Sequence, residues 1–287
     1  MSENPAIAIA PYGTKFGLWP GRLPLDAMHW PLGQPERLCG GVLGDMAAAD
    51  HLITYPCNTI HYRPFWGVKA QLSVMVLEPS VIHARHLRAL RRSHGRFFRV
   101  LSYNDDLLAA IPNGIFLTFG TTWVPQWRDL DVSKTRMVSL IASAKRSQEG
   151  HELRHATVEW AQGAGLDVDV MGRGYMPFER KAEGLASYRF SVVIENTRER
   201  NYFSEKLLDA VLCETVPIYW GCPNIGDFMD TDGMILCESE ADLRRAVMAA
   251  SEAEYAARLP ALRAIKGVAD SYGDVEKRAA QSVLDSL

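Results

Sequence analysis

The feature that most limits the possible folds is a succession of short apolar runs, each separated from the next by polar or helical sequence. Runs of this length and composition are typical of strands buried in parallel sheets. Strands that alternate with helices predict an α/β fold with right-handed crossovers. The runs form two series: residues 6–10, 52–55, 72–77, 97–101 and 115–119, and then residues 137–142, 168–171, 190–194, 216–220 and 234–237.

The stretch GTTWVPQWRDLDVSK, residues 120–134, separates the two series. It combines glycine, proline and polar residues without sustained periodicity, which is typical of a connection between domains. A chain of 287 residues also suits two modest domains, since single domains usually hold about 100–200 residues. We predict one domain over residues 1–125 and a second over residues 126–287. A final helix within residues 275–287 could pack back across the junction.

The overall charge argues against nucleic acid as a partner. The formal net charge is -3 and the isoelectric point is near 6.3, whereas nucleic-acid-binding domains carry a basic surplus. The cysteines are odd in number and include no CxxC pair, which argues against both a disulfide framework and a zinc site. They are Cys39, Cys57, Cys213, Cys222 and Cys237.

The N-terminal sequence MSENPAIAIAPYG does not predict an export signal. It carries an acidic residue where a signal peptide needs positive charge, and its apolar stretch is short. No apolar run reaches the roughly 20 residues of a membrane span. These features predict a cytoplasmic protein and leave contact with a membrane surface open.

The most informative segment is YRFSVVIENTRERNYFSEKLLDAVLCETVPIYWGCPNIGDF, residues 188–228, which reads as strand, loop, helix and strand. The strand would end at Glu195 and Asn196, on the edge of the sheet where open α/β folds bind ligands. Ser204 can cap the helix that follows, and the apolar positions of this helix share one face.

Lys206 stands in the first turn of that helix, next to Glu205. A glutamate complements the positive end of a helix, but a lysine adds charge there and costs stability unless an anion arrives. A diphosphate would be such an anion, held by the helix amides and the ammonium group together. The spacing alone fits a surface lysine that points into water equally well.

The fragments YRFSVVIEN, YFSEKLLDAV and TVPIYWGCPNI resemble the donor-binding signature of family-ten glycosyltransferases, the α-1,3/1,4-fucosyltransferases. The FEN-like turn, the SEK triplet and the VPIYWG strand occur in the family's order and at its spacing. A weaker resemblance covers SLIASAKRSQEGHELRHATVEWA, residues 139–161, where Arg154 matches an arginine that binds the donor phosphates. Further upstream, VMVLEPSVIH, residues 74–83, resembles the family's ESP motif with the serine displaced to Ser80.

The resemblance implies that Arg154 and Lys206 hold the diphosphate and that Glu205 bonds donor hydroxyls. It places Asn196 and Tyr202 in the same pocket. Without the neighbouring motif, Arg154 would be interpreted as a solvated helix arginine. The resemblance also implies GDP-fucose as donor and a carbohydrate as acceptor. We expect no cofactor and no metal, since lysine, arginine and a helix dipole can replace the charge of a metal.

Similarity to this family further implies the GT-B architecture, in which two Rossmann-like domains face each other across an interdomain cleft. The donor would lie in the C-terminal half and the acceptor in the N-terminal half. The family inverts the anomeric carbon by a single displacement, which requires a base for the acceptor hydroxyl. We predict that Glu78, at the end of the apolar run 72–77, is this base.

Two other patterns compete with this interpretation. DxD pairs bind a metal in the other major glycosyltransferase architecture, but three occurrences of so short a pattern give each of them little weight. The Gly172-Arg-Gly174 sequence fits a phosphate turn or an ordinary tight turn. The DxD pairs are Asp129/Asp131, Asp167/Asp169 and Asp230/Asp232.

Retaining enzymes of the two-domain type carry two glutamates with seven residues between them. Glu205 and Glu214 have eight residues between them, and we interpret Glu214 as a solvated residue at the helix end. The tryptophans Trp123, Trp127 and Trp220 could stack on sugars, although buried structural positions are the better expectation.

The run HARHLRALRRSHGR, residues 83–96, predicts a basic helix in which Arg85, Arg88 and Arg92 share a face. A solvated face is the usual meaning of such a run. The alternative is attraction of an anionic acceptor or membrane surface.

The leading hypothesis is an inverting fucosyltransferase. One alternative keeps the fold and the diphosphate site but uses another nucleotide sugar, since no residue of the sequence identifies fucose uniquely. Another is a relative that binds nucleotide sugars without catalysis, suggested by the altered motif at Glu78.

Overall fold

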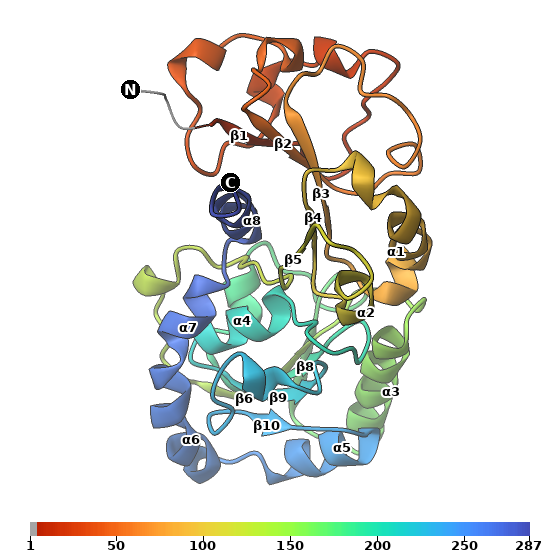
Figure 1. Cartoon of the computed structure of the whole chain (residues 1–287). Coiled ribbons are helices and arrows are strands. Elements are labelled where there is room, and N and C mark those ends of the chain that lie inside the picture. The colour runs from red at the N-terminus through yellow and green to blue at the C-terminus, as the bar shows by residue number, and fades with distance from the viewer. Residues whose placement is uncertain (1–4) are drawn as a thin grey trace. The chain divides into compact units, whose positions relative to one another are not determined.

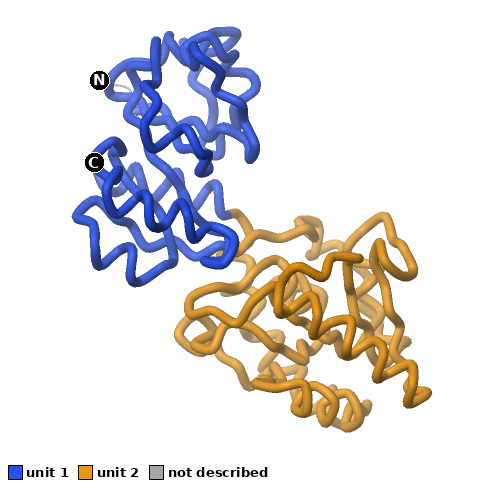
Figure 2. The backbone as a smooth tube through the Cα atoms, turned by 90° about the vertical axis from the view of Figure 1, so that its right-hand side faces the viewer, with its two compact units in different colours: residues 1–119, 275–287 blue, residues 120–274 orange. Residues whose placement is uncertain are grey.

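The computed structural model describes residues 5–287, which form two compact units (Figure 2). Unit 1 comprises the residues up to Phe119 together with residues 275–287, and unit 2 comprises residues 120–274. The division after Phe119 lies at the start of the connection identified in the sequence. The last segment belongs to unit 1, whereas the sequence-based division assigned it to the second domain.

Unit 1 is built on a parallel sheet with the strand order β1-β2-β3-β4-β5 (Figure 1). Each strand lies within a few residues of the run that predicted it. The strands are β1 (Ile7–Ile9), β2 (His51–Thr54), β3 (Gln71–Val76), β4 (Val100–Ser102) and β5 (Gly114–Phe116). Because their order along the sheet follows the chain, this sheet has no reversal of strand order.

The helices of unit 1 are α1 (Ser80–Ser93), α2 (Asp105–Leu108) and α8 (Val275–Leu284). The connection from β1 to β2 contains no α-helix and is built around the short 3-10 helices η1 (Pro20–Arg22), η2 (Leu25–Ala27), η3 (Glu36–Leu38) and η4 (Leu43–Asp45). Since this connection provides no α-helix, the apolar side of α8 packs against β1 instead. Its residues Val275, Ala279 and Val283 are buried against Ile9 and other strand residues, which places α8 beside β1 (Figure 1).

Unit 2 contains a second parallel sheet with the order β10-β9-β8-β6-β7. Its strands are β6 (Arg136–Ile141), β7 (Val168–Met171), β8 (Tyr188–Ile194), β9 (Val216–Trp220) and β10 (Ile235–Leu236). The chain first runs from β6 to β7 and then returns to the other side of β6 at β8. The strand order therefore reverses between β6 and β8, and such reversals are where α/β sheets bind ligands.

The α-helices of unit 2 are α3 (Glu149–Gly163), α4 (Glu205–Leu212), α5 (Glu240–Ala249), α6 (Glu252–Ala264) and α7 (Lys266–Ser271). The predicted cap is confirmed, since the Ser204 hydroxyl accepts a hydrogen bond from the backbone NH of Lys206. The apolar positions of α4 are fully buried in the core of the unit, as expected: Leu207, Leu208, Val211 and Leu212.

Two expectations about exposure are wrong. Glu214 is not solvated: its side chain is 12% exposed and accepts hydrogen bonds from Arg263 and Lys266, both at 2.9 Å. Glu214 follows α4 with its backbone in the left-handed region, φ 56°. In this position its carboxylate lies within hydrogen-bonding distance of Arg263 and Lys266. Trp123 is not buried but 61% exposed, whereas Trp220 is buried as expected.

No helix within residues 5–287 combines the length and the apolar character needed to cross a membrane.

Candidate functional site

A pocket of about 1000 Å³ opens within unit 2 at the carboxyl ends of β6 and β8, where the strand order reverses. Its lining includes Arg154 from α3, Asn196 from the loop after β8, and Glu205 and Lys206 from the start of α4. Four of the five residues predicted to bind a donor are therefore brought together in one pocket.

The Lys206 ammonium, which lines this pocket, lies between two carboxylates. Its Nζ is 3.3 Å from Glu195 Oε2 and 3.3 Å from Glu205 Oε1, and it donates to the Ser204 hydroxyl at 2.9 Å. Burial disfavours the ammonium, but these carboxylates outweigh it and raise the pKa of Lys206. The lysine is thus held charged and oriented before any ligand arrives.

Glu195 organises this arrangement, and sequence reasoning gave it no role. Its side chain is fully buried and accepts hydrogen bonds from the Ser204 backbone NH at 2.8 Å and the Ser204 hydroxyl at 2.6 Å. One carboxylate therefore fixes both the helix cap and the lysine. The signal was present in the sequence, because a glutamate directly after a buried strand needs partners.

The charge of Glu205 is balanced in the same way. Burial would raise the pKa of this carboxyl, but Lys206 and Lys181 outweigh it and lower the pKa below its usual value. Glu205 is therefore an ionised acceptor, able to receive hydrogen bonds from ligand hydroxyls.

Arg154 is buried, and part of its hydrogen-bonding capacity is used within the protein. Its Nε donates to the Ile194 carbonyl at 3.0 Å and one terminal nitrogen donates to Asn196 Oδ1 at 2.9 Å. Burial lowers its pKa, while Glu195 and Glu205 act in the opposite direction. Asn196 thus orients the guanidinium. These two hydrogen bonds do not use the other terminal nitrogen of Arg154.

Helix α3 approaches the loop after β8 so closely that only glycine fits at the contact. A Cβ atom on Gly150 would lie 1.7 Å from the Glu195 carbonyl oxygen, and the Gly150 NH donates to the Asn196 carbonyl at 3.0 Å. This contact brings Arg154, one turn further along α3, to the end of β8.

The pocket contains further cations that the sequence analysis did not select. Lys145 and Lys181 line it together with Arg173 and Arg180. Burial lowers the pKa of Lys181, and its ammonium lies 5.6 Å from the ring centre of Trp123 at the rim. Lys145 comes shortly after the end of β6, just as Asn196 comes after the end of β8. This position at a strand end could have identified Lys145 as a pocket residue from the sequence. No local pattern marked Lys181.

A surplus of positive charge is the main electrostatic property of the pocket. Six lysine and arginine residues line it against two glutamates, and its one histidine, His151, is uncharged at neutral pH. Burial and the nearby Arg154, Lys145 and Lys206 lower the pKa of His151 to about 4. Such a lining suits a ligand with more than one negative charge.

Two predicted residues lie elsewhere. Tyr202 is buried and is not among the side chains that line the pocket, although it is close enough to Arg154 to affect its pKa. Glu78 belongs to unit 1, where it follows β3 directly before α1. It is partly exposed, and the Tyr103 hydroxyl donates to its backbone carbonyl at 3.2 Å.

The competing patterns have structural explanations. The DxD aspartates are absent from the described lining of the pocket. Asp169, for example, accepts hydrogen bonds from Arg136 at 2.6 Å and Tyr188 at 3.0 Å. Gly172 does line the pocket, but it is required for packing: its φ is +116° and a Cβ would lie 2.0 Å from the Ala142 carbonyl oxygen.

Comparison with known proteins identifies the segment around this pocket. Residues 132–246 match the model of "Glycosyltransferase family 10 (fucosyltransferase) C-term". The alpha-(1,3)-fucosyltransferase FucT of Helicobacter pylori is 43% identical over 69 residues, which are 24% of this chain and 14% of FucT. The 4-galactosyl-N-acetylglucosaminide 3-alpha-L-fucosyltransferase FUT5 of Gorilla gorilla gorilla is 26% identical over 230 residues, 69% of this chain and 57% of FUT5. These matches span less than two thirds of either relative.

The likeness in fold extends further than the likeness in sequence. A crystal structure of an alpha1,3-fucosyltransferase with GDP-fucose superposes with a TM-score of 0.52, covering 90% of this chain and 82% of that one at 16% identity. Two parallel-sheet α/β units and this similarity confirm the GT-B fold class. Residues 132–246 thus match the C-terminal model of glycosyltransferase family 10, in agreement with the motifs found in the sequence.

Proposed function

We propose that this protein transfers fucose from GDP-fucose to a hydroxyl of a carbohydrate acceptor, with inversion at the anomeric carbon. The observation that carries the proposal is the pocket at the β6/β8 reversal, where six cations face two glutamates. A nucleoside diphosphate supplies the negative charge that such a lining attracts. The match of residues 132–246 to the family-10 fucosyltransferase model supports fucose as the sugar.

In this proposal the donor binds unit 2. Lys206 and Arg154 contact the diphosphate, and the N-terminus of α4 adds its partial positive charge. Glu205 accepts hydrogen bonds from sugar hydroxyls, and Asn196 holds the guanidinium of Arg154 in place. Tyr202, which lies behind the lining, supports Arg154 in this proposal instead of contacting the donor.

The reaction is a single displacement. The acceptor oxygen attacks the anomeric carbon, the bond from that carbon to the diphosphate oxygen breaks, and GDP leaves with the bonding electrons. Glu78 accepts the proton of the acceptor hydroxyl. Lys206 and Arg154 stabilise the charge that develops on the leaving diphosphate, which is the electrostatic task that metals perform in other enzymes.

Two other functions remain compatible with the pocket. The cations would hold the diphosphate of any nucleotide sugar, so a different donor is the first alternative. A protein that binds nucleotide sugars without turnover is the second, because the serine of the ESP-like motif is displaced to Ser80.

The test is a thermal-shift panel of GDP-fucose, GDP-mannose and UDP-glucose, followed by turnover measurements. A ligand at a hundred times its dissociation constant adds about 2.7 kcal/mol of stability. We expect the largest shift with GDP-fucose and release of GDP when acceptors are added. A larger shift with UDP-glucose would favour the first alternative. Binding of GDP-fucose without turnover over a broad acceptor panel would favour the second.

A further inference from the structure

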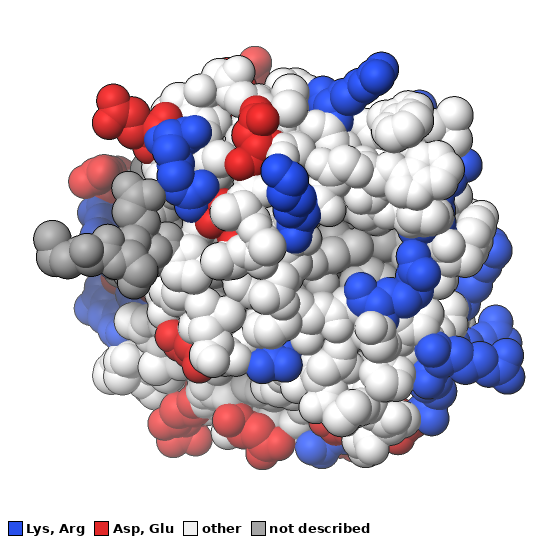
Figure 3. All heavy atoms as spheres, turned by 45° about the horizontal axis from the view of Figure 1, so that its top comes forward, with Lys and Arg blue, Asp and Glu red and all other residues white. Residues whose placement is uncertain are grey.

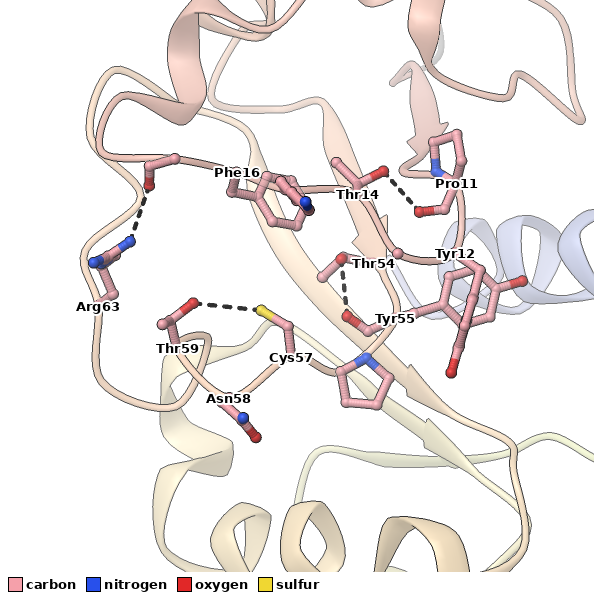
Figure 4. A pocket seen from close by; sticks show the side chains of 14 residues that line it. Pro11, Tyr12, Thr14, Phe16, Thr54, Tyr55, Cys57, Asn58, Thr59 and Arg63 are labelled. Atoms are coloured by element: carbon pink, nitrogen blue, oxygen red, sulfur yellow. Dashed lines mark hydrogen bonds between the residues drawn. The ribbon is translucent and has the colours of Figure 1, made fainter.

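A second pocket, of about 410 Å³, lies in unit 1 at the carboxyl ends of β1 and β2 (Figure 4). Its walls come from residues 11–17, which follow β1, and residues 54–59 with Arg63, which follow β2. The pocket therefore lies at the carboxyl edge of the sheet, the edge on which ligands of open α/β sheets bind, although the strand order does not reverse here. No step of the donor chemistry uses it.

The two segments that form the pocket are joined to each other. The rings of Phe16 and Phe65 lie 4.8 Å apart, and Arg63 donates to the Gly17 carbonyl at 3.2 Å. Further along, the Gly21 NH donates to the Trp66 carbonyl at 3.1 Å. At this last contact a Cβ on Gly21 would lie 2.5 Å from the Gly67 carbonyl oxygen, so the backbones touch directly.

The charged side chains that line the pocket are both cationic. They are Lys15 and Arg63, and no aspartate or glutamate is among the described lining residues. One carboxylate touches the wall from behind: Glu276 of α8 accepts from the Tyr55 hydroxyl at 3.2 Å and contacts His29 Nδ1 at 2.7 Å. Glu276 is not among the lining residues, so the charges that a ligand in the pocket would meet directly are those of Lys15 and Arg63.

Aromatic rings continue from the pocket along the same two segments. Tyr12 is 67% exposed and meets Tyr55 edge to face at 5.2 Å. Both rings stand across the pocket from Arg63 in the view of Figure 4. Beyond the pocket, Trp19 and Trp66 are 54% and 50% exposed with their ring centres 5.4 Å apart.

Arg22 adds a third cation, with its guanidinium carbon 5.6 Å from the ring centre of Trp19. Figure 3 brings the top of Figure 1 forward and shows lysine and arginine side chains on this face among uncharged residues, together with aspartate and glutamate side chains. Exposed rings are amphipathic surfaces that suit ligands with both apolar faces and polar edges. Sugar rings have this character.

We propose that this pocket binds an acidic oligosaccharide. Lys15 and Arg63 contact the anionic group of one sugar, whose ring lies against Tyr12, and the next sugar packs on the Trp19 and Trp66 pair. The role of this ligand as the fucose acceptor rests on the function proposed above. Its binding does not, because every residue named belongs to unit 1 and none is among the residues that line the donor pocket.

The basic helix α1 offers the rival explanation for any preference for acids. Arg88 and Arg92 are exposed on this helix in the same unit, but they line neither pocket. A diffuse attraction by the charged surface of unit 1 would also weaken when these arginines are removed, most clearly at low salt, where screening is weak. This makes them a matched control.

The experiment measures binding by calorimetry, without donor, to the full-length protein. The probes are a disaccharide of glucuronic acid and N-acetylglucosamine, the same disaccharide with glucose in place of glucuronic acid, and glucose 6-phosphate. Each is titrated into the wild type, Lys15→Gln, Arg63→Gln, Trp66→Ala and the double variant Arg88→Gln/Arg92→Gln. Circular dichroism checks that each variant is folded.

We expect the glucuronate disaccharide to bind at least about tenfold more tightly than its neutral analogue, as a charge-assisted contact provides. Lys15→Gln and Arg63→Gln should remove most of that preference, and the α1 double variant should keep it. Trp66→Ala should weaken both disaccharides and leave glucose 6-phosphate unchanged. If the phosphate ester binds as tightly as the acidic disaccharide, the pocket recognises anions alone and the oligosaccharide assignment is overturned.

Equal affinity of the wild type for the acidic and neutral disaccharides would also overturn the proposal. The same holds if the α1 double variant loses as much of the acid preference as Lys15→Gln and Arg63→Gln do. These outcomes are independent of catalysis. Acid-selective binding without fucose transfer would leave the pocket assignment intact and contradict the proposed function. Fucose transfer to neutral acceptors, without any preference for acidic ones, would support the proposed function and contradict the pocket assignment.

Discussion

The two sheets have the same number of strands and all their strands are parallel, yet their carboxyl ends differ. In unit 2 the strand order reverses between β6 and β8, and the pocket there rests on buried ionised groups that hold one another, with Glu195 fully buried beneath Lys206. In unit 1 the order is sequential, and the charged residues at the β1 and β2 ends are lysine and arginine on loops.

The difference separates two ways of making a binding site. Buried charges in unit 2 are preorganised, so a ligand meets donors and acceptors that need no rearrangement, and salt screens them little. Charges on the loops of unit 1 stay hydrated and interact more weakly. We therefore expect unit 2 to determine donor affinity, and unit 1 to contribute the proton acceptor and the choice of acceptor. Each of the following experiments tests one side of this contrast.

The largest effect should come from unit 1, through the chemistry and not through binding. Glu78→Gln keeps the shape of the side chain but removes the base, and a positioned base contributes about 10²–10⁴-fold. Turnover should fall at least about a hundredfold with unchanged GDP affinity, as measured by steady-state kinetics and calorimetry. A folded variant with near-normal turnover would show that Glu78 has only a structural role.

The contact between α3 and the loop after β8 should be the most sensitive structural point of unit 2. Gly150→Ala places a methyl group against the Glu195 carbonyl oxygen, and overpacking of this kind typically costs about 1–3 kcal/mol. We expect a lower melting temperature and weaker GDP binding. Gly163→Ala, at the end of the same helix, is the control, since nothing lies within 4 Å of its Cβ position. Equal behaviour of the two variants would contradict the close-packing argument.

Removal of a cation from the donor pocket should weaken GDP binding by about tenfold or more, since charge-assisted hydrogen bonds contribute about 1.5–3 kcal/mol. The variants are Lys206→Ala and Arg154→Ala, measured by calorimetry. Arg198→Ala is the control, because Arg198 lies in the loop after β8 but pairs with Glu238 and does not line the pocket. Wild-type affinity in both pocket variants would reject the diphosphate assignment.

Asp209 offers a pH test of the buried charges. Burial raises its pKa from 3.8 to about 7, while its Oδ1 accepts from Thr122 at 2.7 Å and from the Trp123 NH at 3.1 Å. The folded state therefore binds an extra proton between pH 4 and 7, so stability falls as pH rises through this window. Glu205 and Lys181 also act on Asp209. Chemical denaturation at several pH values should show a shallower decline in Asp209→Asn, and an unchanged slope would contradict the assignment.

Chelation of divalent metal should have the smallest effect. The cations of unit 2 supply the charge that a metal would provide for the leaving group, so we expect unchanged turnover in EDTA. Loss of activity that manganese or magnesium restores would mean that a DxD pair, outside the pocket in this structure, takes part after all.

The sequence predicted the strands well because burial in a parallel sheet demands continuous apolar runs, as in residues 190–194 and 216–220. It also predicted α4 and its Ser204 cap, since both signals are local. What escaped prediction depends on contacts between one structural element and another. The partners of Glu195 come from the next helix, and Lys181 reaches the pocket from a segment with no periodic pattern.

Four of the five residues proposed to bind the donor line the pocket of unit 2, and their place in the topology explains why the sequence could bring them together. Arg154, Asn196, Glu205 and Lys206 follow strand ends or begin helices, positions that topology brings together. The pocket of unit 1 is built from loops whose glycine contacts, such as Gly21 against Gly67, leave no regular pattern in the sequence. The family-10 model also matches residues 132–246 and does not include these loops.

The position of α8 has a consequence for how the protein is made. Unit 2 is continuous in sequence, whereas the core of unit 1 includes Val275, Ala279 and Val283, which lie beyond the end of unit 2. A ribosome therefore releases all of unit 2 before it supplies the helix that completes unit 1. During synthesis the apolar residues on the β1 side of the first sheet stay exposed until α8 has been made. Unit 2 can fold before that point. The nascent chain is thus most exposed to chaperones and proteases in the part that was translated first.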